Sequence, residues 1–456
     1  MKVLFAVLAM ASLPLAAQKE TPPPGGPPKP FHLPKTEDFS LPNGMKVTIV
    51  PFGIVPRTAI RAFVEAGGVN EAANEVWLSR LTGLLMKEGT TSRSGEQLAQ
   101  EAAGMGGQLE IDARAEETIA GGIVLSEFAP RFIGLLADAL RNPSFPESQL
   151  ARLKADLGRE LAIAKTQPGD LARERFFQVL FPDNPYGRQF PSEDDLKSYT
   201  VEKVRMFYRD NFGAARTHLY IAGKLEGDLH GAIQTAFGDW PRGPEPKNIS
   251  AEMTKARSLS VIDRPGSAQS TLYIGLPVAS PVSPDYVKLD VMNALLGGSF
   301  ASRITSNIRE QKGYTYSPRS QIGTHKHLAW WVETADVTTS VTGPSLKEIF
   351  YEVDRMRKDP PSEQELQGIQ NYLAGLFVLR NTISPDALIG QLRFVDSQGL
   401  DRSFLSSYVT KVTAVKPADV QRVAESYIMP GKMTIVVVGD KAKIANQLEP
   451  YETVVQ

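Results

Sequence analysis

The sequence predicts an α+β fold built from two consecutive, similar halves. Three pairs of strand and helix patterns recur along the 456 residues. Their first residues are separated by 212, 216 and 216 positions, and a repeat of that length corresponds to a whole domain. The three pairs are the β-branched strands at 47–50 and 259–262, the helix starts at 145–150 and 361–366, and the helix–strand units at 204–223 and 420–439.

Each half has the same expected order: two strands, a helix, a Gly-rich turn, two strands, two or more helices and a last strand. Residues 270–276 alternate between polar and apolar side chains, as in a strand with one covered face. Residues 129–140 carry an apolar stripe at helical spacing that suits such a face. Strands paired by hairpins, with helices grouped on one side, predict two tandem homologous α/β sandwich domains rather than a doubly wound sheet.

Composition sets the expected domain boundaries. Residues 241–257 begin with a Pro-rich, polar stretch and should link a first domain at 36–240 to a second at 258–456. Residues 18–35 are also Pro-rich, and we expect an extended leader there rather than part of a core.

The first 17 residues have the pattern of a secretory signal peptide, with Lys2, a short apolar stretch and small residues before Gln18. The apolar stretch is shorter than the about 20 residues that span a membrane, so an uncleaved anchor is the less favoured alternative. We expect cleavage after Ala17, a secreted or periplasmic protein, and no stable membrane anchor. The chain has no cysteine, so its core must be stable without disulfides. A net charge of −1 without long Lys/Arg runs argues against a nucleic-acid partner.

Several short stretches carry a family resemblance in their order and spacing. They are residues 41–44 (Leu-Pro-Asn-Gly), 66–68, 88–93, 184–187 (Asn-Pro-Tyr-Gly), 296–303 and 308–317. From about residue 36 to the C-terminus, the chain resembles the pitrilysin or insulinase-like metallopeptidases, which include the mitochondrial processing peptidases. The resemblance implies two repeated domains per half-molecule, and two half-molecules that close like a clamshell over an unfolded peptide.

The family's catalytic signature is H-x-x-E-H, in which two histidines on one helical face bind zinc and the glutamate is the general base. In this chain the matching helix lies at 75–90, and the three positions hold Arg80, Gly83 and Leu84. The family's distant glutamate ligand falls near Glu160, for which a solvated helix carboxylate is the favoured interpretation. We therefore expect no metal in this chain, and zinc in a partner.

The other residues give no strong alternative site. Among the five histidines, His325 and His327 would lie on the same side of a strand, and surface histidines are favoured over a weak metal site. The G-x-S-x-G elbow of a serine hydrolase does not occur. The Gly-rich turns at 104–107 and 297–298 lack the Lys-Ser/Thr of a phosphate loop and are interpreted as tight turns.

Residues 299–311 are predicted to form an amphipathic helix with Phe300, Ile304 and Ile308 on its apolar face. Gly313 can supply the left-handed stop of that helix. A strand should follow, with Tyr314 and Tyr316 on the same side.

The family resemblance implies a catalytic role for two residues of this region. Complete members have an arginine and a tyrosine, seven apart, that face the zinc from the opposite half of the clamshell, and Arg309 and Tyr316 match them. A guanidinium can orient a carbonyl or carboxylate, and a phenol can donate a hydrogen bond to an oxyanion. The alternative is a structural role, with Arg309 at a helix C-terminus and Tyr316 packed in a strand.

Two functions remain open. In the first, the chain is the non-metal-binding subunit of a secreted two-chain zinc peptidase, whose homologous partner carries H-x-x-E-H. Extended peptides would add as strands to exposed sheet edges, and the resemblance places the candidate edge at Ala66, Gly67 and Gly68. In the second, the chain is a non-catalytic peptide-binding or scaffold protein of the cell envelope, for instance a homodimer. The retained Arg309 and Tyr316 favour the first.

Overall fold

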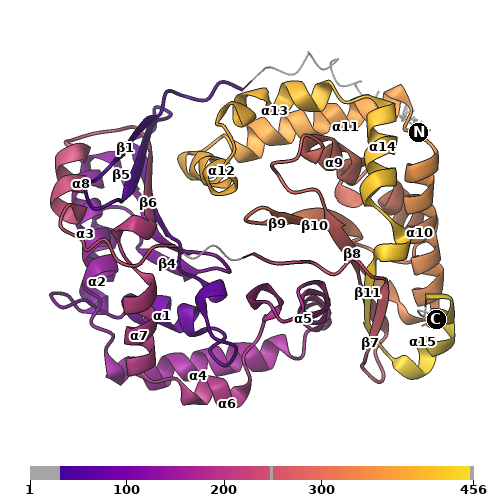
Figure 1. Cartoon of the computed structure of the whole chain (residues 1–456), viewed down its shortest axis with the longest axis horizontal. Coiled ribbons are helices and arrows are strands. Elements are labelled where there is room, and N and C mark those ends of the chain that lie inside the picture. The colour runs from indigo at the N-terminus through magenta and orange to yellow at the C-terminus, as the bar shows by residue number, and fades with distance from the viewer. Residues whose placement is uncertain (1–30, 247–249, 452–456) are drawn as a thin grey trace, which may run out of the picture.

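The computed structural model describes residues 31–246 and 250–451 and contains two mixed sheets that stand side by side (Figure 1). The first sheet has the order β1-β2-β6-β3-β5-β4 and the second β7-β11-β8-β10-β9. The strands of the first sheet are β1 (Glu37–Ser40), β2 (Lys46–Pro51), β3 (Arg57–Val64), β4 (Glu110–Ala113), β5 (Thr118–Leu125) and β6 (Thr217–Gly223). Those of the second are β7 (Ser258–Asp263), β8 (Gln269–Val278), β9 (Arg319–His325), β10 (Leu328–Thr338) and β11 (Thr434–Gly439).

The two sheets share one topology. β2 pairs parallel with β6, as β7 does with β11. On their other side, β6 and β11 pair antiparallel with β3 and β8, respectively. The predicted α+β fold of two similar halves is therefore confirmed.

The helices follow the same repeat. In the first half they are α1 (Leu78–Met86), α2 (Gly95–Gly104), α3 (Ala129–Arg141), α4 (Glu147–Ala164), α5 (Pro168–Leu180), α6 (Glu193–Ser198), α7 (Val201–Asn211) and α8 (Leu229–Phe237). In the second they are α9 (Tyr286–Asn293), α10 (Thr342–Lys358), α11 (Glu363–Leu376), α12 (Pro385–Gln398), α13 (Ser403–Thr413), α14 (Pro417–Tyr427) and α15 (Lys441–Leu448). Three π-helical segments also lie in the second half: η5 (Ala294–Gly298), η6 (Thr305–Gln311) and η8 (Phe377–Asn381).

Local sequence signals explain several helix ends. The Ser94 hydroxyl accepts a hydrogen bond from the Gln97 backbone N–H, and the Gln97 side chain accepts one in return, which caps α2. The Ser362 hydroxyl caps α11 in the same way at the backbone N–H of Glu365. Both α5 and α12 begin with proline, which suits the first helical turn.

The sequence suggested that the helices would be grouped on one side of each sheet. In the structure, helices lie on both sides. On β3, Ile60, Ala62 and Val64 pack with α3 in one core cluster, whereas Ala59 and Phe63 belong to a cluster made mostly of second-half residues. α12 covers this inner face of the first sheet, and α5 covers the inner face of the second (Figure 1). Each half therefore covers the other's sheet with one helix, because successive side chains of a strand point to opposite faces and both faces are apolar.

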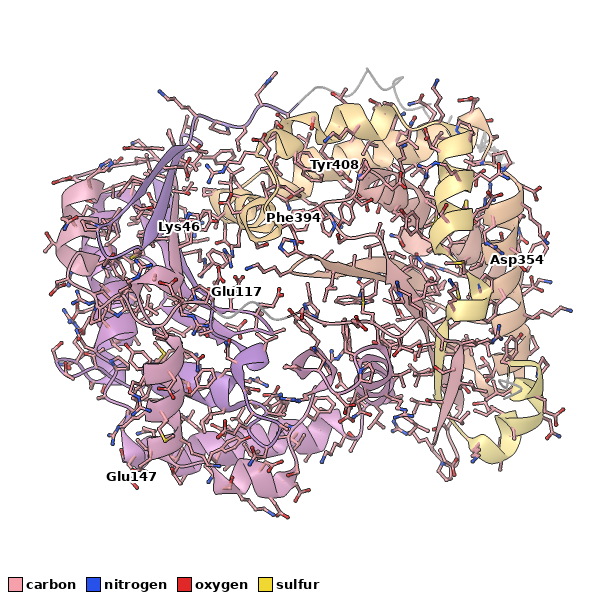
Figure 2. All side chains as sticks on the ribbon, in the orientation of Figure 1. Lys46, Glu117, Glu147, Asp354, Phe394 and Tyr408 are labelled. Atoms are coloured by element: carbon pink, nitrogen blue, oxygen red, sulfur yellow. The ribbon has the colours of Figure 1, made fainter. Side chains whose placement is uncertain are left out.

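Ion pairs and a hydrogen bond also join α12 to the first sheet. Arg61 of β3 binds Asp386 at the start of α12 at 2.8 Å. Glu117 contacts Arg393 of α12 at 2.5 Å, and Figure 2 shows Glu117 on the side of the first sheet that α12 approaches. The Tyr220 hydroxyl donates to the Asp396 carboxylate at 2.6 Å.

The remaining segments bear on the predicted boundaries. Residues 241–246 and 250–257 form no helix or strand. The predicted signal peptide and residues 18–30 of the leader lie outside the described residues. Phe31, where the described chain starts, packs edge-on against Phe377 with 5.6 Å between ring centroids. In the part of the chain that the structure describes, no helix is long and apolar enough to cross a membrane.

Candidate functional site

The helix expected to carry the family's zinc ligands is α1, which is shorter than predicted. It begins at Leu78, because Trp77 adopts a left-handed conformation with φ 73°. The Glu71 carboxylate satisfies the first backbone donors: it accepts hydrogen bonds from Trp77 N at 3.0 Å and Ser79 N at 2.7 Å. Burial raises the pKa of Glu71 to about 7, against these hydrogen bonds, which favour the charged form.

An ion pair joins two of the residues that the family resemblance aligns with zinc ligands. Arg80 binds Glu160 of α4 through two hydrogen bonds of 2.5 and 2.6 Å, and its guanidinium also lies 5.0 Å from the Trp77 ring centroid. Glu160 was expected to be an isolated, solvated carboxylate; it is about half exposed, but it is paired. The family resemblance aligns Arg80 and Glu160 with two zinc ligands, and ligands of one ion must lie close together. The contact between Arg80 and Glu160 agrees with that alignment.

These residues do not fit a zinc ion. A guanidinium stays protonated and offers no lone pair to a metal. Gly83 has no side chain and packs on β4, where an added Cβ would lie 3.4 Å from the Ile111 methyl carbon Cγ2, and Leu84 is apolar. Within residues 31–246 and 250–451, no three His, Cys, Asp or Glu side chains come together in a group that could hold a metal ion.

The substrate edge was predicted near Ala66, Gly67 and Gly68, and these three residues are not themselves part of an edge strand. These residues follow β3, which is paired on both sides, with β5 and β6. Their backbone groups are already bound: the Gly68 N–H donates to the Arg114 carbonyl at 3.0 Å, and the Thr118 hydroxyl donates to the Ala66 carbonyl at 2.6 Å. The edge on this side of the sheet is β4, which packs directly on α1.

Arg309 and Tyr316 lie together. Arg309 is on η6, which ends before Gly313 with φ 65°, the left-handed stop expected there. Its guanidinium carbon lies 4.7 Å from the Tyr316 ring centroid and 4.6 Å from the Phe300 ring centroid. Tyr316 is 79% exposed, so its hydroxyl is free to meet another molecule. The pair forms one surface unit with Phe300, whose position the sequence analysis predicted wrongly.

Two local expectations in this region were wrong. Phe300 was placed on the buried helix face with Ile304 and Ile308, which are fully buried, but Phe300 is 66% exposed and covers Arg309. Tyr314 and Tyr316 do not form a strand with both rings on one side: Tyr314 packs on the core, and the next strand begins only at Arg319. Phe300 falls at helical spacing with Ile304 and Ile308, so periodicity alone placed it on the buried face of the helix.

The two strand histidines differ from the surface pair that was predicted. His325 ends β9 and stacks on Tyr186 of the first half, with 4.0 Å between ring centroids. Burial lowers the pKa of His325. His327 lies in the hairpin turn with φ 62°, and its backbone N–H donates to the Gln398 side-chain oxygen at 2.9 Å. This hairpin tip joins the two halves.

Together, the two repeated α+β halves define a metallopeptidase-like fold. Among the residues that the structure describes, no group of side chains could hold a metal ion. The chain belongs to the M16 (insulinase) peptidase family. Residues 55–191 match the family described as "Insulinase (Peptidase family M16)", and residues 198–373 match "Peptidase M16 inactive domain".

Relatives and solved structures agree with this assignment. A Rickettsia felis protein described as an "Uncharacterized zinc protease" is 23% identical over 347 residues, covering 75% of this chain and 84% of the relative. The "Non-peptidase homolog YmxG" of Helicobacter pylori is 22% identical over 396 residues, covering 86% and 90%. A crystal structure described as a peptidase M16 inactive domain from Pseudomonas fluorescens has a TM-score of 0.81 at 23% identity and covers 89% of this chain and 98% of that one. A Helicobacter pylori protease structure has a TM-score of 0.83 at 18% identity, covering 90% and 100%.

Proposed function

We propose that this chain is the non-catalytic subunit of a secreted, two-chain zinc peptidase that degrades or processes short or unfolded peptides. One observation carries the proposal: Arg80 and Glu160 form an ion pair at the aligned metal positions, while Arg309 and Tyr316 are kept together. Tyr316 is 79% exposed, and the Arg309 side chain is 26% exposed and pairs with Glu310 at 3.1 Å. A homologous partner with H-x-x-E-H supplies the zinc, the water and the general base. The relative named a non-peptidase homolog supports the absence of a metal centre in this subunit.

In the assembled enzyme, Arg309 and Tyr316 act on the substrate held at the partner's zinc. The Arg309 guanidinium, held between two aromatic rings, orients a substrate carbonyl or carboxylate. The Tyr316 hydroxyl donates a hydrogen bond to the oxyanion that develops on the scissile carbonyl. Loss of one such donor typically costs about 2.7–4 kcal/mol of transition-state stabilisation, or 10²–10³-fold in turnover.

Extended peptides bind by adding a strand to a sheet edge. The supporting observation is that β4 is an edge strand that lies against α1, next to Arg80 and Glu160. Backbone hydrogen bonds at such an edge bind peptides with little demand on their sequence. The same proposal includes export by the N-terminal signal peptide and a leader that acts as a spacer.

The experiment that tests this proposal is purification of the native mature chain with whatever co-elutes at equal stoichiometry. The expected partner is a homologue that carries H-x-x-E-H, and the expected complex contains zinc and cleaves unfolded peptides. In that complex, Tyr316→Phe lowers turnover 10²–10³-fold without impairing assembly, since Tyr316 is exposed and Phe keeps the ring over Arg309.

The same measurements decide the second candidate, a peptide-binding or scaffold protein. The exposed aromatic residues around Arg309 are also the kind of group that anchors protein interfaces. A self-dimer or an unrelated envelope protein in the pull-down supports this scaffold. Normal peptide cleavage by complexes with Tyr316→Phe and Arg309→Ala contradicts the catalytic role given to both residues.

A further inference from the structure

A groove of about 400 Å³ opens beside the Arg309–Tyr316 unit, between α11 and residues 299–301, which follow η5. It is lined by Ser299, Phe300, Ala301, Gln364, Glu365, Gly368, Ile369 and Tyr372. Phe300 is shared: one part of the residue lines the groove, and its ring lies 4.6 Å from the guanidinium carbon of Arg309. The groove is therefore continuous with the residues that the proposed function places on the substrate.

The walls of the groove suit an apolar group. Phe300 and Tyr372 are 66% and 41% exposed, so apolar surface of both side chains is open to solvent at the groove. The one charged residue in the lining, Glu365, is bound by Arg303 at 2.8 and 3.0 Å, and these hydrogen bonds lower the pKa of Glu365. Its charge is thus compensated within the protein.

Gly368 keeps the groove open. It lies on α11, and a Cβ added there would meet no atom within 4 Å. Glycine is unfavourable inside a helix by about 1 kcal/mol relative to alanine, so the position gains space at a cost in helix stability. A larger residue at 368 would fill the groove without a clash in the helix.

The helices beside this groove have counterparts in the first half. α4 and α11 begin 216 positions apart, at Glu147 and Glu363, and each packs on the helix that follows the first hairpin of its half, α1 or α9 with its continuation η5. In the first half, Arg80 and Glu160 join these two helices through their ion pair. In the second half, the corresponding helices leave an open apolar groove.

We propose that this groove binds one bulky apolar side chain, aromatic or branched aliphatic, of an extended peptide whose backbone carbonyl lies against Arg309. This inference rests on the proposed function and adds a substrate preference to it. A peptide is favoured as the occupant because the volume suits one or two side chains, and because the cation at one end complements a carbonyl or carboxylate.

The test uses the full mature chain and two fluorescent octapeptides that differ only in a central Phe or Ala. Fluorescence anisotropy measures their Kd values for the wild type, for Gly368→Leu and for a matched control, Gly375→Leu. Gly375 lies two turns further along α11, does not line the groove, and also has no atom within 4 Å of an added Cβ. Circular dichroism checks that all three proteins fold alike.

We expect the wild type and Gly375→Leu to bind the Phe peptide about ten-fold more tightly than the Ala peptide, since burial of an aromatic side chain favours binding by at least this factor. Gly368→Leu should bring the two Kd values together. Equal Kd values in the wild type, or an unchanged ratio in Gly368→Leu, would overturn the groove. A wild-type chain that self-associates in sedimentation, and a Gly368→Leu variant that does not, would instead identify the groove as an interface between copies.

These outcomes are separate from those of the proposed function. If no zinc-bearing partner exists but the Phe preference is present and lost in Gly368→Leu, the groove stands and the two-chain peptidase fails. If a partner complex depends on Tyr316 for turnover but shows no Phe preference, the peptidase stands and the groove fails.

Discussion

The exchange of α5 and α12 predicts that the two halves unfold as one unit, and Phe176→Ala is the sharpest test. Phe176 lies on α5 in the first half of the sequence, yet it is fully buried in a cluster with Trp330, Val436 and other residues of the second sheet. A Cβ added at Gly275 would lie 2.8 Å from the Phe176 ring, so the ring packs directly on the backbone of β8.

The expected loss follows from this burial. Replacement of a buried phenylalanine by alanine typically lowers the free energy of unfolding by about 3–5 kcal/mol, through lost apolar burial and the cavity that remains. This is a large share of the about 5–15 kcal/mol that stabilises a typical protein. Phe300→Ala is the matched control: Phe300 is 66% exposed, so its loss should change the free energy of unfolding by no more than about 0.5 kcal/mol.

The chain's four tryptophans allow each half to be followed separately. Trp77 and Trp240 lie in the first half, and Trp330 and Trp331 in the second. In backgrounds that keep only Trp240 or only Trp331, urea unfolding followed by fluorescence should give one shared midpoint. Phe176→Ala should lower that midpoint equally for both probes. A lower midpoint at Trp331 with an unchanged midpoint at Trp240 would refute the reasoning, because it would mean that the two cores are independent.

Two further predictions concern the region around α1. Burial raises the pKa of Glu71 from 4.5 to about 7, so the folded state keeps this proton to higher pH than the unfolded chain. The associated contribution to the free energy of unfolding is fully present below pH 4.5. It falls by about 3 kcal/mol as the pH rises through 7. Glu71→Gln should flatten the fall in the free energy of unfolding between pH 4.5 and 7, and a slope equal to that of the wild type would contradict the assignment. Arg80 and Glu160 are about one-third and one-half exposed, so a double-mutant cycle with Arg80→Ala and Glu160→Ala should give a coupling of no more than about 1 kcal/mol that weakens in 1 M salt; a coupling of several kcal/mol would show that the pair is far less solvated than the structure has it.

The sequence determined the parts of the fold that depend on local pattern. Strand alternation, helix stripes and a repeat of 212 to 216 positions are properties of neighbouring residues, and they sufficed for the α+β class and the two similar halves. The assignment of the family's zinc positions to Arg80, Gly83 and Leu84 came from the family resemblance rather than from local pattern. The family resemblance also singled out Arg309 and Tyr316, and the structure shows that they lie in contact on either side of the turn at Gly313.

The tertiary structure alone decided which faces and edges are used. The residues after β3 read as a possible edge, but β5 and β6 enclose that strand through pairings with segments about 60 and 160 positions away. Arg80 and Glu160 are 80 positions apart, and nothing in either neighbourhood indicates their ion pair. α5 and α12 have ordinary amphipathic patterns that do not say which sheet they cover. A periodic pattern reports that a side chain is buried, but its partner is set by long-range packing, which is why these contacts appear only in the folded chain.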